Sequence, residues 1–282
     1  MVYILYNPKS SEGTARKYVN EAVEKFSGEK VETKSVTDIE SYKKFFSSID
    51  KEDKVVLLGG DGTINYLVNE MKGEKIENEL FLFMAGTGND FLRDIYDKVP
   101  EEGTLLQLNE YIEDLPTVTV NGKDYLFING IGYGLDGKCC TIADQQREKG
   151  KTDINYTNIS IKLLLFSYKP TKATVIVDGE EFKYENVWIS PIMNGRYYGG
   201  GMKVTPDQDR KSNVLSTCIF FGKSRINTLM NFPKIFEGEH VKLKGAAVHS
   251  GHEITIKLDR PEDIQIDGEL IKNISEINAR KF

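Results

Sequence analysis

The sequence predicts an α/β domain followed by a mostly antiparallel β domain. In the first part of the chain, short apolar runs alternate with segments of helical periodicity, which is the pattern of a parallel sheet with helices on its faces. In the second part, Asn-Gly or Asp-Gly pairs separate strand-like runs at three places, and such pairs are a strong local signal for β-hairpins. A stretch containing Pro and Glu ends at Pro116, so we predict domains at residues 1–116 and 117–282.

The composition fits two folded domains and excludes several classes of protein. Hydrophobic residues make up 39% of the 282 residues and charged residues 28%, ordinary values for a globular chain without disulfide or metal staples. The formal net charge of −6 argues against general binding of nucleic acid, which needs clustered Lys and Arg. Three cysteines and three histidines favour neither a disulfide framework nor a Cys/His metal cluster. Because no signal peptide or membrane-spanning apolar run is apparent, we expect a cytoplasmic protein.

Each element of the first domain follows from periodicity. The run Val2–Tyr6 is apolar throughout, as in a strand buried on both faces. The next segment places Val19, Ala22, Val23 and Phe26 on one helical face. The expected strands are 2–6, 31–36, 55–58 and 80–85, and the expected helices are 14–26, 39–49, 63–71 and 89–96.

The second domain reads as hairpins with two helical insertions. Turn pairs stand inside the segments 118–127, 173–189 and 263–271. Further apolar runs at 214–222 and 253–258 add strands to the same antiparallel domain. Helical patterns interrupt these strands around residues 138–149 and 155–168.

A Gly-Gly-Asp-Gly-Thr turn joins the third strand to a helix. Gly59, Gly60 and Gly62 permit positive φ and let a ligand approach the main chain, where N–H groups and a helix start favour an anion. A bare Asp61 would repel phosphates, but it fits if it binds Mg²⁺ that also contacts phosphate oxygens. The alternative is a plain strand–turn–helix connection in which Asp61 caps the helix.

A second turn of similar composition, at residues 85–90, follows the next strand. In a parallel sheet both turns lie at the carboxyl edge, where open α/β folds bind ligands. The two turns can then converge on one polyphosphate, with Thr87 bonded to a phosphate oxygen. Asn89 and Asp90 stand at a helix start and can bind phosphate or assist the metal, and the alternative for both is N-capping.

Six motifs occur in the order seen in the bacterial diacylglycerol kinase family. The segments are NPKSSEG, GGDGTINYLVNE, GTGNDFLRD, NGIGYGLDG, NGRYYGGGMKVTP and a late IDGE. The chain resembles this family of lipid kinases over almost its whole length; sphingosine and ceramide kinases are related. The resemblance implies a Rossmann-like α/β nucleotide-binding domain, a β-sandwich domain, and an active site in the cleft between them. It also implies ATP and Mg²⁺ as cofactors, with transfer of the γ-phosphoryl group to the hydroxyl of diacylglycerol or a similar lipid alcohol in phospholipid biosynthesis.

The same resemblance assigns roles to individual residues. Glu269 matches the general base, which activates a lipid hydroxyl by accepting its proton. Asp61 is the other catalytic residue, and it joins Asp90 and Asp267 in the metal network. The nucleotide-binding residues implied are Asn7, Gly59, Gly60, Gly62, Thr63, Gly86, Thr87 and Asn89.

Three departures from the family pattern concern acidic residues. Tyr66 stands where the family often has Glu. After the GGGM segment many family members have Asp-Gly and a further Asp that bind a structural Mg²⁺, but the stretch DQDRKSNVLST has Lys211, Ser212 and Ser216 near those positions, so we expect that site to be lost or rebuilt. A third acidic residue of the metal network has no clear match, and Asp136 or Asp124 are the candidates to replace it.

The motif Asp-Gly-Glu occurs twice, at residues 178–180 and 267–269. Spacing does not separate the two copies, and either can be a hairpin turn with an exposed Glu. Only the family order favours Glu269 over Glu180 as the base.

Two further segments have competing interpretations. The glycine-rich stretch Asn194–Pro206 either lines an acceptor cleft or forms a bulge or wide turn. Residues 138–172 carry seven Lys or Arg beside the apolar run YTNISIKLLLFSY. This region is either a membrane-docking face or, as we favour, a helix that packs its apolar face inward.

The leading hypothesis is therefore a lipid kinase that contacts a membrane transiently and peripherally when active. A kinase of a soluble acceptor is the second hypothesis, because NAD kinases share the Gly-Gly-Asp-Gly turn. The third is a nucleotide- or lipid-binding sensor without turnover. We expect a diacylglycerol-like lipid acceptor as partner, no nucleic acid, and possible homodimerisation.

Overall fold

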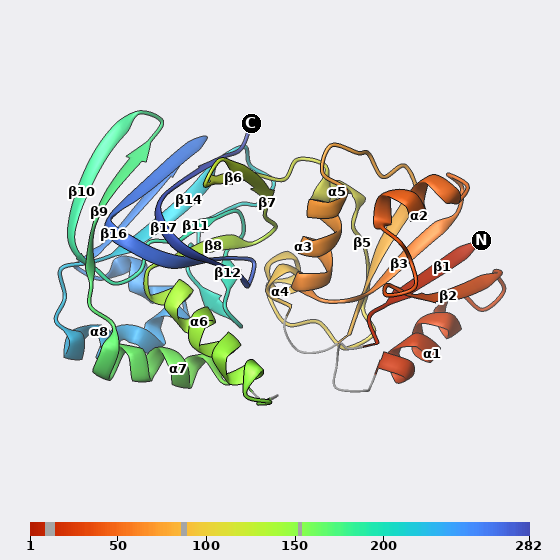
Figure 1. The fold of residues 1–282 in the computed structure, drawn as a ribbon, viewed down its shortest axis with the longest axis horizontal. Coiled ribbons are helices and arrows are strands. Elements are labelled where there is room, and N and C mark those ends of the chain that lie inside the picture. Colours follow the sequence, from red (N-terminus) through yellow and green to blue (C-terminus); the bar gives the residue numbers. More distant parts are fainter. Residues whose placement is uncertain (9–14, 86–88, 152–153) are drawn as a thin grey trace. The chain divides into compact units, whose positions relative to one another are not determined.

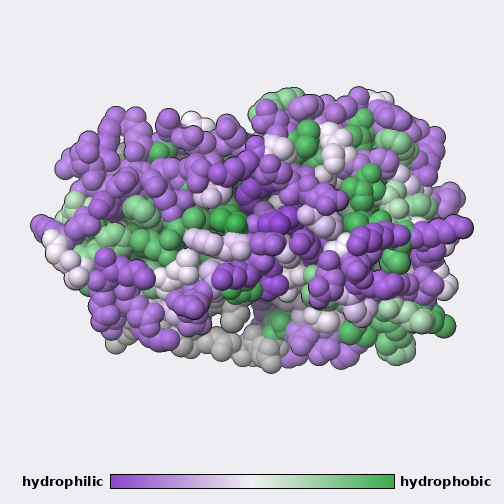
Figure 2. Space-filling model, turned by 180° about the vertical axis from the view of Figure 1, so that it is seen from behind, coloured by the Kyte–Doolittle hydropathy of each residue, from purple (hydrophilic) through white to green (hydrophobic). Residues whose placement is uncertain are grey.

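The computed structural model describes residues 1–8, 15–85, 89–151 and 154–282. The chain divides into two compact units, Met1–Leu115 and Pro116–Phe282 (Figure 1). Polar side chains cover most of the face seen in Figure 2, with hydrophobic ones gathered in smaller groups. Both predicted fold types are confirmed, because the first unit is α/β and the second is built on an antiparallel sheet.

The first unit contains a five-stranded sheet in the order β2-β1-β3-β4-β5. The first four strands are parallel, and β5 pairs antiparallel with β4. The sequence patterns predicted the parallel strands, but β5 and the short helix α5 lie in a stretch expected to be a linker. The bounds are β1 Val2–Tyr6, α1 Ala15–Lys25, β2 Val31–Ser35, α2 Tyr42–Ser48, β3 Lys54–Gly59, α3 Asp61–Glu70, β4 Glu79–Met84, α4 Asp90–Tyr96, β5 Leu105–Gln107 and α5 Asn109–Ile112.

Helices pack on the two faces of this sheet because successive strand residues point to opposite sides. Val2 and Ile4 of β1 join a buried cluster with Ala22 of α1. Tyr3, between them, faces the other way and meets Phe45 of α2 edge-on, with ring centroids 5.4 Å apart. This two-sided burial explains why β1 reads as an unbroken apolar run.

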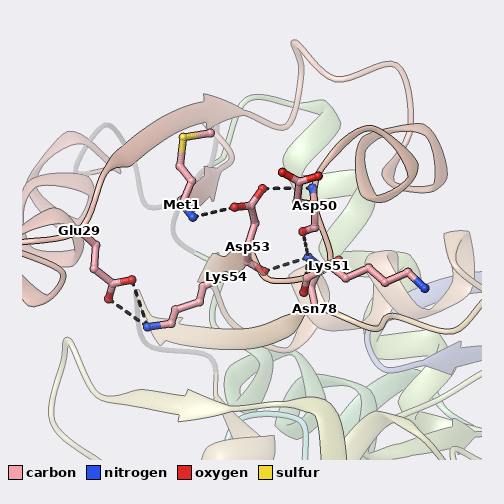
Figure 3. A network of polar contacts seen from close by, with 7 residues as sticks. All are labelled: Met1, Glu29, Asp50, Lys51, Asp53, Lys54 and Asn78. Carbon is pink, nitrogen blue, oxygen red and sulfur yellow. Dashed lines mark hydrogen bonds and ion pairs between the residues drawn. The ribbon is translucent and has the colours of Figure 1, made fainter.

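A polar network stabilises the edge of the sheet where β1 and β3 begin (Figure 3). The Met1 amino group donates to Asp53 Oδ1 at 2.6 Å. Asn78 Nδ2 donates to backbone carbonyls of the turn 50–53, and Lys54 Nζ pairs with Glu29 at 3.0 Å. The carboxyl ends of the parallel strands lie at the opposite edge of the sheet, and the residues of this network take no part there.

The second unit is built on an antiparallel sheet in which β8, β16 and β17 are central. Strand β16 also pairs with β9 of a neighbouring hairpin. The bounds are β6 Thr117–Val120, β7 Lys123–Leu126, β8 Gly130–Tyr133, β9 Thr171–Val177, β10 Glu180–Val187, β11 Ile192–Met193, β12 Tyr197–Tyr198, β13 Met202–Lys203, β14 Leu215–Phe220, β15 Ala246–Gly251, β16 Glu253–Ile266 and β17 Glu269–Arg280.

All three predicted hairpins form. They connect β6 to β7, β9 to β10 and β16 to β17. Asn121, Asp178 and Asp267 have φ of 50°, 48° and 47°, and each is followed by a glycine of positive φ. Two central residues of positive φ are what a two-residue type I′ hairpin requires, and Asn-Gly and Asp-Gly tolerate this best.

Helices cover one side of the second unit. They are α6 Leu135–Glu148, α7 Tyr156–Lys162, the π-helical turn η2 Leu163–Ser167, α8 Arg225–Asn231, and the 3₁₀ turns η3 Phe232–Ile235 and η4 Glu239–Lys242. Helix α6 approaches β16 so closely that a Cβ on Gly137 would lie 1.7 Å from the Asp263 carbonyl oxygen. Only glycine fits there, so this residue sets how α6 packs on the sheet. Among the described residues, we find no helix that is long and apolar enough to cross a membrane.

Candidate functional site

Residues of three neighbouring strands meet at the carboxyl edge of the first sheet. Asn7 follows β1, the glycine turn follows β3, and the second turn follows β4. Because β1, β3 and β4 are parallel neighbours, the topology brings these segments to one edge, as predicted. Asn7, Asn89 and the residues from Gly59 to Thr63 therefore share the edge where open α/β folds bind ligands. Gly86 and Thr87 lie outside the described residues.

The glycines of the first turn serve a different purpose from the one expected. None of Gly59, Gly60 and Gly62 is among the residues of positive φ, so the turn does not use the positive φ that these glycines permit. Gly59 is required by space instead, because a Cβ there would lie 2.0 Å from Thr63 Oγ1. Helix α3 starts two residues earlier than predicted, with Gly60 as N-cap and Asp61 in the first turn.

Asp61 does cap a helix, but the helix is not its own. Its Oδ2 accepts the Asp90 N–H at 2.9 Å and its Oδ1 accepts the Phe91 N–H at 3.2 Å. These two donors are the first N–H groups of α4, which would lack intrahelical partners. Asp61 thus joins the two predicted turns, and a carboxylate at a helix start is favoured by the helix dipole.

The start of α4 contains further polar and charged side chains. Asn89 occupies the N-cap position, but its side chain makes no capping bond. The Asp90 carboxylate is buried and lies 4.0 Å from Arg93 Nε. Asp94 is also buried, one position after this arginine. Sequence reasoning missed Arg93 and Asp94, which were visible only as polar residues in a short helix.

In the second unit, Asp267 binds the start of a neighbouring segment through backbone N–H groups. Its Oδ2 accepts from Ile128 at 2.6 Å, and its Oδ1 accepts from Asn129 at 2.9 Å and from Gly130 at 3.0 Å. The Asp267 N–H donates back to the Gly130 carbonyl. Charge-assisted bonds of this kind are among the stronger ones in proteins, so they fix the hairpin that carries Glu269.

Glu269 is the first residue of β17 and its side chain is exposed. A hydrogen bond supports the turn before it: the Gly268 N–H donates to Oε1 of the buried Gln265 at 2.6 Å. A carboxylate held at the end of a rigid hairpin and open to solvent can accept a proton from a bound hydroxyl. Nothing in the sequence identified Gln265 as a support, since a strand residue of alternating polarity usually faces solvent.

The earlier Asp-Gly-Glu copy has the same shape and different neighbours. Asp178 accepts the N–H groups of His252 at 3.1 Å and Glu253 at 2.8 Å, in an exposed setting. Glu180 starts β10 and is exposed, as Glu269 is. The structure therefore confirms two hairpins of one type and does not by itself assign the base.

The segment in which the family resemblance predicts a structural Mg²⁺ is held by side chains of this chain. Gln208 Nε2 donates to the carbonyls of Asn194 at 3.3 Å and Val214 at 2.9 Å. Ser216 Oγ donates to Gln208 Oε1 at 2.5 Å. These bonds hold the loop through protein groups, and Ser216 is one of the residues that stand near the family's metal-binding positions.

Two cations reinforce the same loop. The buried Lys281 Nζ donates to the Arg210 carbonyl at 2.6 Å and to Asn194 Oδ1 at 2.8 Å. Arg210 in turn donates to the Ile128 carbonyl at 2.9 Å and to Asn129 Oδ1 at 3.1 Å. The Lys281 ammonium and the Arg210 guanidinium thus donate to oxygen atoms of this loop and its neighbours. Arg210 also bonds to the segment 128–130, which Asp267 binds through its backbone N–H groups.

Asp136, a candidate for the missing acidic residue, is held inside the second unit. Its carboxylate accepts the Tyr198 hydroxyl at 2.5 Å. Burial raises the pKa of Asp136 to about 6, although the bond from Tyr198 opposes this shift. Tyr198 belongs to the glycine-rich stretch, which forms the small β12–β13 hairpin with three glycines of positive φ at its tip. The predicted wide turn is therefore present, and Met202 of the same stretch also lines a pocket beside Asp136.

An apolar pocket adjoins Asp136. Its cavity volume is about 30 Å³, and its polar lining includes Asp136 and His240. Burial lowers the pKa of His240, so this side chain favours its neutral form. The apolar lining residues include Leu164, Trp188, Phe220 and Ile235.

The residues present fit Mg²⁺ in one respect. Mg²⁺ in nucleotide sites is usually held by one or two carboxylates together with phosphates and waters. Asp61 supplies a carboxylate, the ligand type that this ion prefers, and its two oxygens accept the first N–H groups of α4. Among the described residues, no group of three or more His, Cys, Asp or Glu side chains could hold a metal by itself. The metal roles of Asp61, Asp90 and Asp267 stay predictions.

Comparison with known families decides what kind of chain this is. The family model described as "Diacylglycerol kinase catalytic domain" matches residues 1–120. The model described as "YegS C-terminal NAD kinase beta sandwich-like domain" matches residues 129–278, more than half of the chain.

The chain belongs to the bacterial diacylglycerol kinase family. It is similar to a diacylglycerol kinase of Mycobacterium tuberculosis, with 26% identity over 251 residues that cover 86% of this chain and 80% of the relative. A diacylglycerol kinase of Bacillus subtilis is 22% identical over 276 residues, covering 94% and 88%. The family makes this chain a kinase of the diacylglycerol kinase type.

A solved structure supports the fold of this kinase. The structure described as a diacylglycerol kinase from Bacillus anthracis matches with a TM-score of 0.69 at 17% sequence identity. The match covers 100% of this chain and 93% of that chain. It agrees with an α/β unit followed by an antiparallel β unit.

Proposed function

We propose that this kinase transfers the γ-phosphoryl group of Mg-ATP to the hydroxyl of diacylglycerol or a similar lipid alcohol. The observation that carries the proposal is the position of Asp61. One carboxylate links the glycine turn after β3 to the start of α4, at the strand edge where nucleotides bind in open α/β folds. Family membership supports the use of ATP.

In this proposal the first unit binds the nucleotide. Backbone N–H groups at the start of α3 favour the phosphates, and Asn7, Thr63 and Asn89 lie at the same strand edge. The turn residues Gly86 and Thr87 take the roles that the family resemblance gives them. Asp61 would hold Mg²⁺ with help from Asp90 and Asp267, and the ion would neutralise charge on the phosphates.

Glu269 would act as the general base in the second unit. A lipid alcohol is a weak nucleophile, so a carboxylate must accept its proton as the phosphorus–oxygen bond forms. Bonds from Asp267 to three backbone N–H groups hold the hairpin rigid. Rigid support matters because a catalytic group misplaced by about 1 Å loses much of its effect.

The names of the relatives favour a lipid acceptor, because the similar proteins of Mycobacterium tuberculosis and Bacillus subtilis are named diacylglycerol kinase. The pocket beside Asp136 does not supply the acceptor site, because a cavity of about 30 Å³ holds about one water molecule. We propose further that the kinase works in the cytoplasm, contacts membranes transiently, and is able to form a homodimer.

The test is transfer of labelled phosphate from Mg-ATP to a bacterial lipid extract, beside parallel tubes that contain NAD. Label in an organic-soluble product is the expected result, and mass spectrometry of that product identifies the acceptor. Label in NADP would place the protein among kinases of soluble acceptors. ATP binding without any transfer would overturn the enzyme proposal in favour of a sensor.

Asp61→Asn tests the observation that carries the proposal. The amide keeps one hydrogen-bond acceptor for α4 but loses the charge that suits a metal ion. We expect transfer to fall at least 100-fold, together with a modest drop in melting temperature, because the amide NH₂ cannot accept the second N–H of α4. Transfer at the native rate would remove Asp61 from the mechanism.

A further inference from the structure

Four large apolar side chains are exposed on two segments of the second unit. Leu165 and Phe166 of η2 are 38% and 78% exposed, and Ile226 and Met230 of α8 are 71% and 74% exposed. Figure 2 shows hydrophobic residues gathered at the edge of this unit that carries α7 and α8. Large apolar residues exposed together mark an interaction site more often than scattered ones do.

The two segments are fixed side by side. Arg225, the first residue of α8, donates through its guanidinium to the carbonyls of Leu163, Leu164 and Tyr168. Two of these carbonyls belong to the first residues of η2 and the third to the residue after it, so one guanidinium spans the whole turn. The exposed side chains are therefore held in place and do not belong to a loose loop.

Each segment divides into a buried face and an exposed face. In η2, Leu163 and Leu164 are buried while the next two residues point outward. In α8, Thr228 is buried, whereas Ile226 and Met230 lie four positions apart on the opposite face. The expectation that residues 138–172 pack their apolar face inward is thus half correct, since Leu163 and Leu164 are buried whereas Leu165 and Phe166 are exposed.

The same segments are basic in an acidic chain. Residues 154–177 contain Lys162, Lys169 and Lys172 and no Asp or Glu, and residues 221–236 contain Lys223, Arg225 and Lys234 and again no acid. Lys172 pairs with Glu185 of β10 at 3.0 Å, and Arg225 is used within the fold. Lys162, Lys169 and Lys234 are exposed and stand within four residues of an exposed apolar residue along the chain, although the whole chain carries a net charge of −6.

We propose that η2 and α8 form a docking surface for a bilayer rich in anionic lipid. Exposed apolar side chains on segments that also carry exposed lysines match the acyl–headgroup boundary of such a membrane, where acyl chains take up the apolar groups and anionic headgroups attract the lysines. A second copy of this chain is a poorer occupant, because a symmetric contact would bring the same lysines together. This proposal rests on the proposed function, because the surface would bring the kinase to the membrane that contains its lipid acceptor.

The test measures sedimentation with phosphatidylglycerol vesicles in the absence of ATP. Phe166→Ser with Met230→Ser is expected to weaken vesicle binding roughly 100-fold, about tenfold for each buried apolar side chain. Val248→Ser is the matched control, because Val248 is a 47% exposed apolar residue on β15 of the same unit. The control should bind as the native protein does, and thermal unfolding checks that all variants fold.

Charge is tested separately. Lys162→Gln with Lys169→Gln and Lys234→Gln should weaken binding to the anionic vesicles about fivefold for each lysine, and added salt should do the same. Lys183→Gln on β10 is the control for charge. Phosphatidylcholine vesicles should bind the native protein more weakly than phosphatidylglycerol vesicles do.

Three results would overturn the docking surface. They are native binding by the Phe166/Met230 variant, an equal loss in the Val248 control, or a loss of dimer in the Phe166/Met230 variant on sizing. Transfer to a lipid dispersed in detergent micelles separates the two proposals. Transfer without vesicle binding would reject the surface alone, whereas vesicle binding through these residues without transfer would reject the kinase proposal alone.

Discussion

The two Asp-Gly-Glu hairpins of the second unit are one turn used in two settings. Asp178 and Asp267 have φ of 48° and 47°, and the glycines that follow have φ of 89° and 95°. In both copies the aspartate carboxylate accepts backbone N–H groups of another segment. The local sequence thus determines the turn, the register and the exposed position of the glutamate.

The surroundings of the hairpins differ. Asp178 accepts two N–H groups in an exposed setting, and the residue two positions before it is Ile176. Asp267 accepts three N–H groups of the segment 128–130, and Gln265, two positions before it, holds the turn glycine. A site therefore depends on the segments that long-range folding brings to a turn, and a short motif cannot show this.

The largest expected difference in stability concerns the two aspartates. Asp267→Ala leaves three N–H donors of a partly buried segment without acceptors, so we expect it to lower the free energy of unfolding by about 3 kcal/mol. Asp178→Ala exposes its two donors to water and should cost about 1 kcal/mol. Urea unfolding of both variants measures this. Equal losses would mean that the two settings are equivalent.

The buried carboxylate near the Asp267 hairpin should make stability depend on pH. A Cβ on Gly132 would lie 2.6 Å from Asp136 Cβ and 2.8 Å from Gln265 Nε2, so Asp136 packs close to this support. Its pKa is raised from 3.8 to about 6 by burial. The ionised form is therefore disfavoured in the fold, and the penalty grows as pH rises from about 4 to 6 and is constant above that.

Asp136→Asn should remove this penalty. We expect the variant to match the native protein near pH 4 and to exceed its unfolding free energy by roughly 2 to 3 kcal/mol at pH 7. Urea unfolding across pH provides the measurement. Parallel pH profiles for the two proteins would show that Asp136 titrates normally in the fold.

The hydrogen bond from Gly268 to Gln265 should contribute less to the free energy of unfolding. Gln265→Leu removes the acceptor of the Gly268 N–H and should cost about 1.5 kcal/mol. Ile176→Leu, at the corresponding position of the other hairpin, keeps an apolar residue and should cost less than 1 kcal/mol. Equal losses of stability for Gln265→Leu and Ile176→Leu in thermal unfolding would show that the bond from Gly268 to Gln265 does not stabilise the turn.

The smallest effect should be the same in both hairpins. Gly179 and Gly268 have positive φ, and no atom lies within 4 Å of a Cβ built on either. Their replacement by alanine therefore costs only backbone strain, about 1 kcal/mol in each case. A clearly larger loss at Gly268, measured by urea unfolding, would show that the later turn is constrained beyond its own conformation.

Sequence patterns predicted the features that depend on near neighbours. Asn-Gly and Asp-Gly pairs located all three hairpins, and apolar runs located the parallel strands with Asn7 and Asp61 at one edge. Patterns missed what long-range packing decides: Asp61 caps α4 rather than its own helix, and Lys281 supports a loop some 70 residues earlier. The role of Gly59 was also missed, because only the folded turn brings the Thr63 side chain to where a Cβ on Gly59 would lie.

The most direct test compares the two glutamates in one assay. Glu269→Gln and Glu180→Gln make the same change at the same position of matched hairpins, with labelled Mg-ATP and a lipid extract as substrates. If Glu269 is the general base, its variant should lose transfer at least 100-fold, the usual effect of removing such a group, while Glu180→Gln stays within about twofold of the native rate. Equal rates for the two variants would contradict the assignment, whether both are active or both are silent.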